Sequence, residues 1–245
     1  MRTIGLDISD HILRLAVLHQ NRHGFLLPVH GDIPLPHGAI SDGIINQADI
    51  VVENLQRLLA AAKPKTRRVV AAIPERHSFV KVLTLPADSP LSENAVQTEA
   101  AQFVPYTAEE MYTSWMAIPG DSKEQKVLFG ATPRSVIDTY LRVLERAKLE
   151  VVRLELESLA LTRGVLPANY HGVSIILDLG TTRSTLVLVV DGIVHFTTTL
   201  RYSGKDLDSY IAESLAITPD QARRAKEVFG LDPDKGKGLD RKSVV

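Results

Sequence analysis

Two short segments, far apart in the chain, share the pattern of an apolar strand that contains one aspartate near its end. Residues 4–8 read Ile-Gly-Leu-Asp-Ile and residues 175–179 read Ile-Ile-Leu-Asp-Leu, so Asp178 follows Asp7 at an offset of 171 residues. Each segment is followed by a short turn and a second apolar strand. The repeat predicts an internal duplication with one strand-turn-strand hairpin in each half, and with additional chain inserted in the first half.

Hairpins of this kind are suited to clamping a polyphosphate. Small turn residues let backbone N–H groups close on phosphate oxygens, and an aspartate at each strand end can hold a hydrated Mg²⁺. The second hairpin supplies Gly180 and the hydroxyls of Thr181 and Thr182, and fits this chemistry. The first hairpin has Ser9 and Asp10 in its turn, where a small uncharged residue is expected.

Composition excludes several other classes of protein. The 28 Lys and Arg residues against 29 Asp and Glu give a net charge of −1, which argues against nucleic-acid binding. The absence of cysteine excludes disulfides and thiolate metal sites and fits a reducing compartment. No apolar stretch approaches the roughly 20 residues needed to cross a bilayer, and acidic residues near the N-terminus argue against a secretory signal, so we expect a cytoplasmic protein.

Hydrophobic periodicity predicts a sheet covered by a helix in the first part of the chain. Apolar runs at 3–8, 12–19 and 25–33 predict three antiparallel strands. An amphipathic helix is expected after an Asn46 cap and before Pro64, followed by a buried strand at 68–73.

A separate α+β module is predicted over 78–154, in the order strand, helix, strand, strand, helix, strand. Its strands are expected at 79–85, 112–118, 126–131 and 150–154, and its helices run from a Ser89-Pro90 cap to Phe103 and over 133–147. Phe103 and Trp115 are expected to be largely buried.

The remaining chain predicts a helix, three strands and two further helices. The helix lies at 157–165, the strands at 173–179, 184–190 and 193–200, and the last two helices at 205–215 and 219–228. Asp191-Gly192 is expected to form a tight hairpin turn, and Thr218 with Gln221 a capping box.

The order of these elements and several short motifs resembles the actin-like ATPase superfamily, and more narrowly the PilM family of type IV pilus assembly proteins, which are related to FtsA. The likeness covers residues 1–230. It rests on the two hairpins and on these further segments: Asp42-Gly43, Ala71–Pro74, Leu85-Pro86, Glu99–Pro105, Glu155–Arg163 and Ser203-Gly204.

The resemblance implies an actin-like (ribonuclease H-like) α/β fold with duplicated lobes, an inserted SHS2-type α+β module and an incomplete second lobe. We expect the first lobe at 1–77, the module at 78–154, a return helix of the first lobe at 155–170, part of the second lobe at 171–230 and a tail at 231–245. Residues 240–245 match one reading frame of a sequencing adapter, which predicts a scar at the end of a truncated coding sequence.

The function implied by the resemblance is that of a scaffold on the inner-membrane platform that assembles type IV pili. It would be cytoplasmic, peripheral to the inner membrane and attached there only through partners. These partners would be other platform proteins and a PilN-like inner-membrane protein, whose cytoplasmic tail would lie in a groove between the first lobe and the inserted module.

The same resemblance implies an ATP and Mg²⁺ site between the two lobes. Its nucleotide-binding residues would be Asp7, Ser9, Asp178, Gly180, Thr181, Thr182, Gly204 and Lys226, and its metal ligands Asp7 and Asp178. For Lys226 the residues themselves favour a solvated helix face over a position near the nucleotide base, and for Glu157 they favour a structural role over the orientation of a hydrolytic water. We expect no catalytic residue, and a nucleotide-binding assembly protein more than a turnover ATPase.

Three departures from the family pattern predict weak or vestigial ATP binding. In the first hairpin, Ser9 replaces a glycine and Asp10 a small hydroxyl residue, and the glycine-rich adenosine segment of the family would lie beyond the expected truncation. Arg223 stands where the family usually has an acid that faces the nucleotide. If the Asp10 carboxylate faced a phosphate at about 4 Å, the repulsion would cost ~1 to ~4 kcal/mol, or one to three decades of affinity. Recruitment of Asp10 by Mg²⁺, or a side chain that faces away, are the alternatives.

Two other functions fit the same superfamily. A sugar-kinase-like enzyme would need both phosphate hairpins intact, and the Ser9-Asp10 turn argues against it. The cytoplasmic domain of the type II secretion protein GspL would share the fold and continue into a transmembrane helix.

Overall fold

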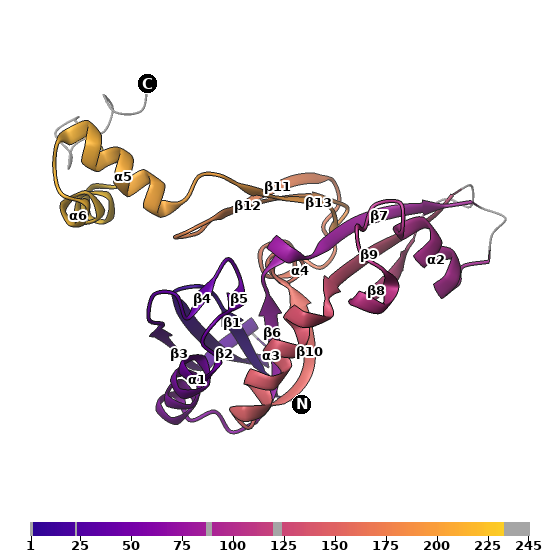
Figure 1. Cartoon of the computed structure of the whole chain (residues 1–245), viewed down its shortest axis with the longest axis horizontal. Helices are drawn as coiled ribbons and strands as arrows, with labels where there is room; N and C mark the ends of the chain where they lie inside the picture. Colours follow the sequence, from indigo (N-terminus) through magenta and orange to yellow (C-terminus); the bar gives the residue numbers. More distant parts are fainter. Residues whose placement is uncertain (1, 23, 87–89, 120–123, 233–245) are drawn as a thin grey trace. The chain divides into compact units, whose positions relative to one another are not determined.

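The computed structural model describes residues 2–22, 24–86, 90–119 and 124–232. The expected adapter scar at 240–245 therefore lies outside the described residues, as does the proposed cap at Ser89. The chain divides into two compact units. Unit 1 comprises Met1–Ile175 and Val187–Thr197, and unit 2 comprises Ile176–Leu186 and Thr198–Val245. Figure 1 shows the elements of each unit along the chain.

A five-stranded mixed sheet forms the centre of unit 1 (Figure 1). Its strands are β1 (Ile4–Ile8), β2 (Ile12–Asn21), β3 (Gly24–Pro34), β6 (Arg68–Ile73) and β10 (Glu150–Leu156), in the order β10-β6-β1-β2-β3. β1 pairs antiparallel with β2 and parallel with β6, which is itself parallel to β10. The predicted antiparallel meander of the first three strands is confirmed.

Helices α1 (Ala48–Ala62) and α3 (Arg134–Arg146) pack against each other and complete the main core. Their apolar stripes bury Val51, Leu55, Tyr140 and Leu144 at 0 to 1% exposure, next to the buried side chains of the sheet. The expected Asn46 cap is wrong, because Gln47 occupies the N-cap position and the Asn46 side chain donates to the carbonyl of Gly38.

The inserted module has its own sheet and its own core. Strands β7 (Phe79–Leu85), β9 (Gln125–Pro133) and β8 (Met111–Ile118) pair antiparallel in the order β7-β9-β8. One face packs on α2 (Glu93–Ala100), and the short helix η2 (Ala108–Glu110) precedes β8. The pattern had placed α3 and β10 in this module, but β10 joins the five-stranded sheet beside β6, and α3 packs on α1.

Three local expectations for the module are also corrected. Helix α2 is capped by Ser92, whose hydroxyl accepts from the backbone N–H of Ala95, and it ends at Ala100. Phe103 is 45% exposed. Trp115 is only partly buried, and its indole N–H donates to Glu93 at 2.6 Å.

A third sheet follows helix α4 (Glu157–Val165), with strands β11 (Val173–Leu179), β12 (Ser184–Val190) and β13 (Ile193–Leu200) in that order. Asp191 and Gly192 have φ of 50° and 77°, so the predicted tight turn is confirmed. Along β11, Val173, Ile175 and Leu179 are 65 to 72% exposed. This exposure is compatible with the expected incomplete second lobe, which stays a prediction.

Unit 2 contains two helices, α5 (Gly204–Leu215) and α6 (Pro219–Phe229), which pack on each other. The predicted Thr218 capping box opens α6, with Gln221 Oε1 accepting from the Thr218 backbone N–H at 2.9 Å. Two short elements of unit 1 matter for the site below. They are the β4-β5 hairpin (Ile40–Ser41 and Ile44–Ile45) and the single-turn helix η1 (Glu75–His77).

Candidate functional site

The first predicted phosphate hairpin is the turn between β1 and β2. The Ser9 hydroxyl donates to the carbonyl of Ile12 at 2.9 Å, so its hydrogen is used inside the turn. Asp7 accepts from Arg14 at 3.1 Å, and its side chain is 38% exposed. Both groups proposed to contact a phosphate or a metal ion thus have partners within the hairpin itself.

Asp10 does not present its carboxylate at the surface of this turn. It is 7% exposed, and its two oxygens accept hydrogen bonds from the backbone N–H groups of Asp42 and Gly43 at 3.1 and 2.9 Å. Of the three alternatives that the sequence leaves open, the structure supports the one in which the side chain faces away from a ligand. Repulsion between Asp10 and a phosphate is therefore not a reason to expect weak nucleotide binding.

The second predicted hairpin meets the start of α5. The backbone N–H of Gly204 donates to the carbonyl of Gly180 at 2.9 Å, and that of Lys205 donates to the carbonyl of Thr181 at 3.0 Å. A Cβ at Gly180 would lie 2.4 Å from the carbonyl oxygen of Arg183, so only glycine fits there. Thr182 and Thr181 are exposed on the turn.

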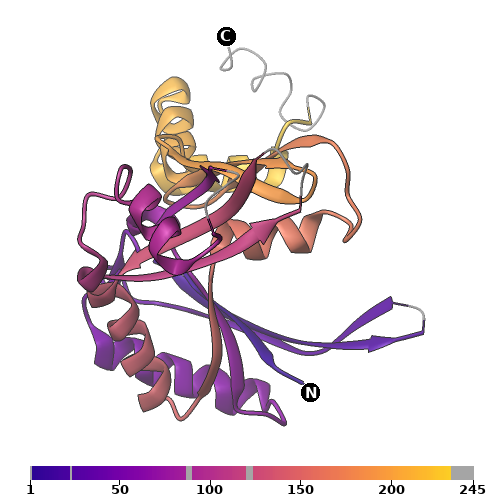
Figure 2. The same ribbon diagram turned by 90° about the vertical axis from the view of Figure 1, so that its right-hand side faces the viewer.

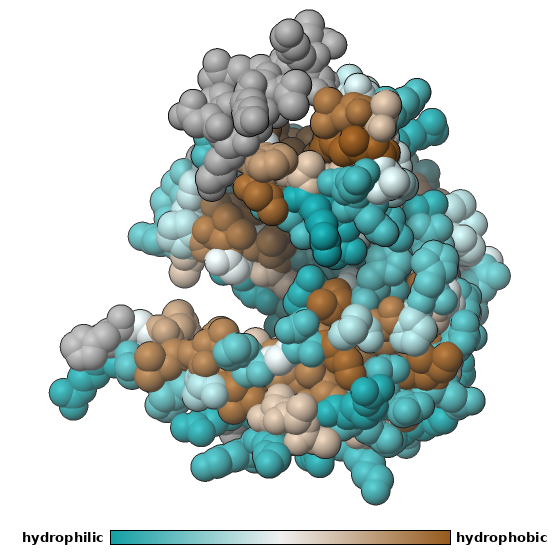
Figure 3. Space-filling view, turned by 90° about the vertical axis from the view of Figure 1, so that its left-hand side faces the viewer, coloured by the Kyte–Doolittle hydropathy of each residue, from teal (hydrophilic) through white to brown (hydrophobic). Residues whose placement is uncertain are grey.

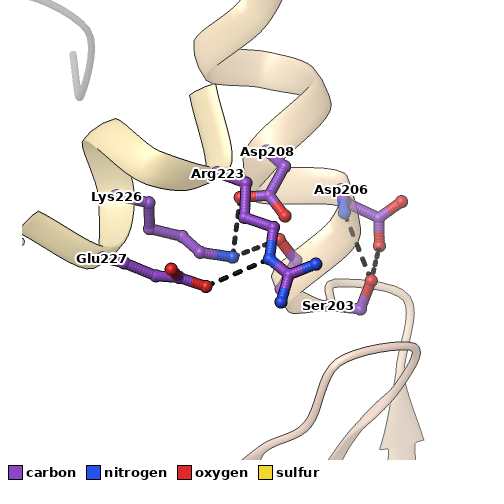
Figure 4. Close-up of polar contacts among 7 residues, drawn as sticks. Ser203, Asp206, Asp208, Arg223, Lys226 and Glu227 are labelled. Carbon is purple, nitrogen blue, oxygen red and sulfur yellow. Dashed lines mark hydrogen bonds and ion pairs between the residues drawn. The ribbon is translucent and has the colours of Figure 1, made fainter. Parts of the chain in front are cut away.

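Lys226 of α6 is part of the same cluster (Figure 4). Its ammonium group donates to the carbonyl of Gly204 at 2.8 Å and pairs with Asp208 at 2.7 Å. The lysine side chain is 27% exposed and that of Asp208 16%, so Lys226 is not on a solvated helix face. Arg223, one turn earlier, instead pairs with Glu227 at 3.0 Å on the exposed side of α6.

Four of the eight predicted nucleotide-binding residues are therefore brought together within unit 2: Gly180, Thr181, Gly204 and Lys226. Asp178 is exposed near the end of β11 in the same unit, whereas Asp7 and Ser9 belong to unit 1. Among the described residues, no group of three or more His, Asp or Glu side chains is placed to hold a metal ion. The two-aspartate metal site stays a prediction.

Unit 1 contains a groove of about 590 Å³ beside the inserted module. One wall is the face of the module sheet that does not contact α2, with Val80, Tyr112, Met116 and Leu128. The opposite wall comes from β10 and α4, with Leu154, Leu156, Leu159 and Thr162. The start of β13 adds Ile193 and Val194. The lining is mostly apolar, which suits apolar side chains of a bound segment.

Among the polar residues that line this groove, Glu155 and Arg163 form an ion pair. Glu155, 9% exposed, accepts from both terminal nitrogens of Arg163, and this hydrogen bond raises the pKa of the guanidinium above its usual value. The arginine side chain remains 59% exposed. The Thr162 hydroxyl is buried and has no hydrogen-bond partner among the described residues. A ligand in the groove can therefore meet the exposed guanidinium of Arg163.

A buried carboxylate, Glu75, lies at the end of β6 next to the first turn of α4. The pKa of Glu75 is raised to about 7, chiefly by burial. Hydrogen bonding from Ser158 and Thr197 lowers the pKa and so opposes this effect, while the nearby charge of Glu157 adds to the rise. The Ser158 hydroxyl donates to Glu75. Glu157 itself lies in the first turn of α4 and is half-buried. Its role towards a hydrolytic water stays a prediction.

Sequence reasoning missed Glu75, Thr162 and the pairing of Glu155 with Arg163. One signal was present in the sequence, because Glu155 and Arg163 are the first and last residues of the motif Glu155–Arg163. A glutamate at a strand end and an arginine two turns into the next helix are separated by eight residues, and only the strand-to-helix reversal brings them together.

No helix in the described ranges combines the length and the hydropathy needed to cross a bilayer.

Comparison with solved structures shows the fold. A structure of a PilM-PilN type IV pilus biogenesis complex matches at 23% identity with a TM-score of 0.78, covering 99% of this chain and 74% of that one. MreB5 of Spiroplasma citri bound to ADP matches at 13% identity and TM-score 0.53, covering 94% and 62%. The cytoplasmic domain of EpsL, an inner-membrane component of the type II secretion system of Vibrio cholerae, matches at 12% identity and TM-score 0.52, covering 88% and 74%.

These similarities confirm the predicted actin-like fold. The GspL alternative is the weaker one, because the likeness to EpsL is well below that to the PilM chain. The sequence profile of one family matches residues 5–237, which is nearly the whole chain. The chain therefore belongs to the family of type IV pilus assembly proteins PilM.

Proposed function

We propose that this chain is a cytoplasmic scaffold of the type IV pilus inner-membrane platform, and that it holds the cytoplasmic tail of a PilN-type protein in the groove of unit 1. The observation that carries the proposal is the mostly apolar groove between the module sheet and the β10-α4 wall. The similarity to a chain solved in a PilM-PilN complex supports the choice of partner.

The lining specifies the chemistry of the tail. Leu128, Leu156 and Leu159 offer an apolar surface for two or three aliphatic side chains of an extended segment. The exposed guanidinium of Arg163 favours a carboxylate at the adjacent position of the tail.

The test is a titration of the chain with a peptide that carries the tail of the neighbouring PilN-like protein. Isothermal titration calorimetry measures the binding, because Trp115, the only tryptophan, packs on the α2 side of the module sheet and donates to Glu93, away from the groove face. Met116→Glu puts a charge on an exposed residue of the apolar lining and is expected to weaken binding at least tenfold. The matched control is Leu91→Glu, an exposed apolar residue of the same module that does not line the groove.

Two results would contradict this proposal. One is the absence of peptide binding by a chain that unfolds cooperatively. The other is an equal loss in the two variants, because a general effect of surface charge does not depend on the groove.

A second ligand, ATP with Mg²⁺, is proposed at the two hairpins, with weak affinity. The fit is partial. The second hairpin provides Gly180, whose place no side chain can take, and the exposed hydroxyls of Thr181 and Thr182. In the first hairpin Ser9 donates inward and Asp7 is paired with Arg14. The similarity to MreB5 solved with ADP supports a nucleotide as the ligand class.

The residues that would hold this ligand are those predicted from the sequence: Asp7, Ser9, Asp178, Gly180, Thr181, Thr182, Gly204 and Lys226. Lys226 would act by holding the start of α5 against the turn at Gly180, because its ammonium already bonds the carbonyl of Gly204.

Calorimetry with MgATP tests this second ligand. We expect dissociation constants above the micromolar range and a further loss with Asp178→Ala. Asp10→Ser is expected to leave the affinity unchanged, since the Asp10 carboxylate bonds the loop at Asp42 and Gly43. Sub-micromolar affinity that is lost on Asp7→Ala would contradict weak binding. Measurement of phosphate release from ATP distinguishes the two kinds of protein. We expect a rate well below about one turnover per minute for an assembly protein, and a faster rate would indicate a sugar-kinase-like or other turnover enzyme.

A further inference from the structure

The hairpin of β2 and β3 extends beyond the sheet as a two-stranded ribbon (Figure 2). β1 pairs with β2 only between Leu13 and Ala16, and β3 is the edge strand of the sheet. The register shifts between Val17 and His19, which marks a bulge. Among the residues that the structure describes, no third strand therefore pairs with the segment from Leu18 to Leu27, which we call the distal ribbon.

The distal ribbon exposes large apolar side chains on both of its faces. Leu18, Phe25, Leu26 and Leu27 are 57, 67, 52 and 48% exposed. Phe25 and Leu26 are consecutive in a strand, so they point to opposite faces. Figure 3 shows brown, hydrophobic surface along a projecting arm of the molecule. Contiguous apolar exposure of this kind marks an interaction site in a soluble domain.

The charge of the distal ribbon has one sign. No Asp or Glu occurs between Ile12 and Gly31, although the whole chain carries 29 acidic residues. Arg22 is exposed near the tip, and Arg2 contacts His19 at the base of the distal ribbon at 3.4 Å. The distal ribbon therefore places exposed apolar side chains next to arginines and has no acidic residue. This combination complements a surface that has an anionic outer layer over an apolar interior.

Pairing with another strand is disfavoured at this edge. Pro28 lies in β3 at the bulge and offers no N–H group. Proline and bulges on an edge strand are the devices that prevent edge-to-edge association. A second copy of the chain, or an added strand from a partner, would therefore meet an interrupted edge.

We propose that the distal ribbon binds an anionic phospholipid bilayer directly. Phe25, Leu26 and Leu27 enter the boundary between headgroups and acyl chains, and Arg22 and Arg2 contact lipid phosphates. This contact adds to any attachment through a PilN-type partner and does not depend on the groove or on the hairpins proposed for nucleotide.

Co-sedimentation of the full chain with vesicles tests the proposal. We expect binding to vesicles of phosphatidylglycerol and phosphatidylethanolamine, at least tenfold weaker binding to pure phosphatidylcholine, and a further fall as salt is raised. The double substitution Phe25→Glu and Leu26→Glu is expected to lower binding at least tenfold. Arg22→Glu should lower it several-fold, while Arg22→Lys should retain it.

Val165→Glu provides the matched control, because Val165 is an exposed apolar residue, 58% accessible, at the end of α4. It should bind vesicles as the unaltered chain does. All variants should keep the thermal unfolding midpoint and the affinity for the PilN-tail peptide, so that failure of the groove proposal and failure of this one are distinguishable.

Three outcomes would overturn the proposal. The first is no binding to anionic vesicles, and the second is equal binding by the Phe25/Leu26 double variant. The third is a dimer in light scattering that this double variant converts to monomer without any vesicle binding, which would assign the distal ribbon to a contact between copies.

Discussion

Asp10 and Gly43, 33 residues apart in the chain, are joined by a buried hydrogen bond of 2.9 Å from the backbone N–H of Gly43 to the Asp10 carboxylate. The carbonyl of Gly43 in turn accepts from the hydroxyl of Tyr140 on α3 at 3.0 Å. Gly43 thus connects the turn of the first hairpin with the helix layer. Asp10, which stands where a phosphate-binding turn would have a small uncharged residue, therefore has a structural role in the fold.

Replacement of Asp10 by Ala is expected to destabilise the chain. The buried N–H group of Gly43 and the part-buried N–H group of Asp42 would both lose a charged acceptor, which costs about 2–4 kcal/mol in the free energy of unfolding. Urea denaturation measures this cost. Asp49→Ala is the control, because the Asp49–Arg146 pair is exposed and its loss costs at most about 1 kcal/mol. Equal stability of the two variants would refute a structural role for Asp10.

Gly43→Ala is expected to cost about 2–4 kcal/mol, from a positive φ and a steric clash together. Gly43 has φ of 79°, and an added Cβ would lie 2.7 Å from the Pro74 ring. Gly164 in α4 has open space at its Cβ position, so Gly164→Ala should be neutral or slightly stabilising. Thermal melts of both variants make the comparison, and a Gly43→Ala variant as stable as Gly164→Ala would disprove it.

The buried Glu75 predicts a pH dependence of stability. Its pKa is about 7 in the folded chain against 4.5 as the ordinary value, so the folded state binds more protons between these two pH values. Its contribution is therefore complete below pH 4.5, falls as the pH rises to about 7, and is constant above that. The full shift corresponds to at most about 3 kcal/mol.

Glu75→Gln should remove this slope and leave the chain more stable than the unaltered protein at pH 8. Chemical denaturation at pH 5, 6, 7 and 8 measures the effect. Glu53→Gln, at an exposed position of α1, is the control and should keep the slope. An unchanged slope in Glu75→Gln would mean that other groups cause it.

Lys226→Met tests the cluster in unit 2. The substitution removes the bond to the carbonyl of Gly204 and leaves the largely buried Asp208 without its cation. We expect faster hydrogen exchange at the start of α5 and a loss of about 1–3 kcal/mol in local stability. Arg223→Met removes an exposed pair from the same helix and should change exchange little. Comparable exchange in the two variants would show that Lys226 has no special role.

Local pattern was sufficient to predict most elements of this chain. The helix at Glu157–Val165 and the strands at Phe79–Leu85, Val173–Leu179, Ser184–Val190 and Ile193–Leu200 occur with the predicted bounds. Periodicity reports which side chains are buried, and burial repeats every two residues in a strand and every three or four in a helix. The Asp191-Gly192 turn and the Thr218 cap were predictable for the same reason, because both depend only on neighbouring residues.

Contacts between distant segments were not predictable in this way. The direction of the Asp10 carboxylate depends on the loop at Asp42 and Gly43, and the environment of Glu75 depends on Ser158, 83 residues further along. Strand β10 was predicted in the inserted module, but it pairs parallel with β6 in the five-stranded sheet, and β6 is distant in the sequence.

By itself, the sequence determined the order of the elements, the two aspartate hairpins and the family to which the chain belongs, since these follow from local pattern and motif order. Only the tertiary structure decided that Asp10 serves the fold, that Lys226 holds the start of α5, and that apolar residues line a groove beside the module. Direction and burial of a side chain are set by whatever packs against it, and that partner is often far away in the chain.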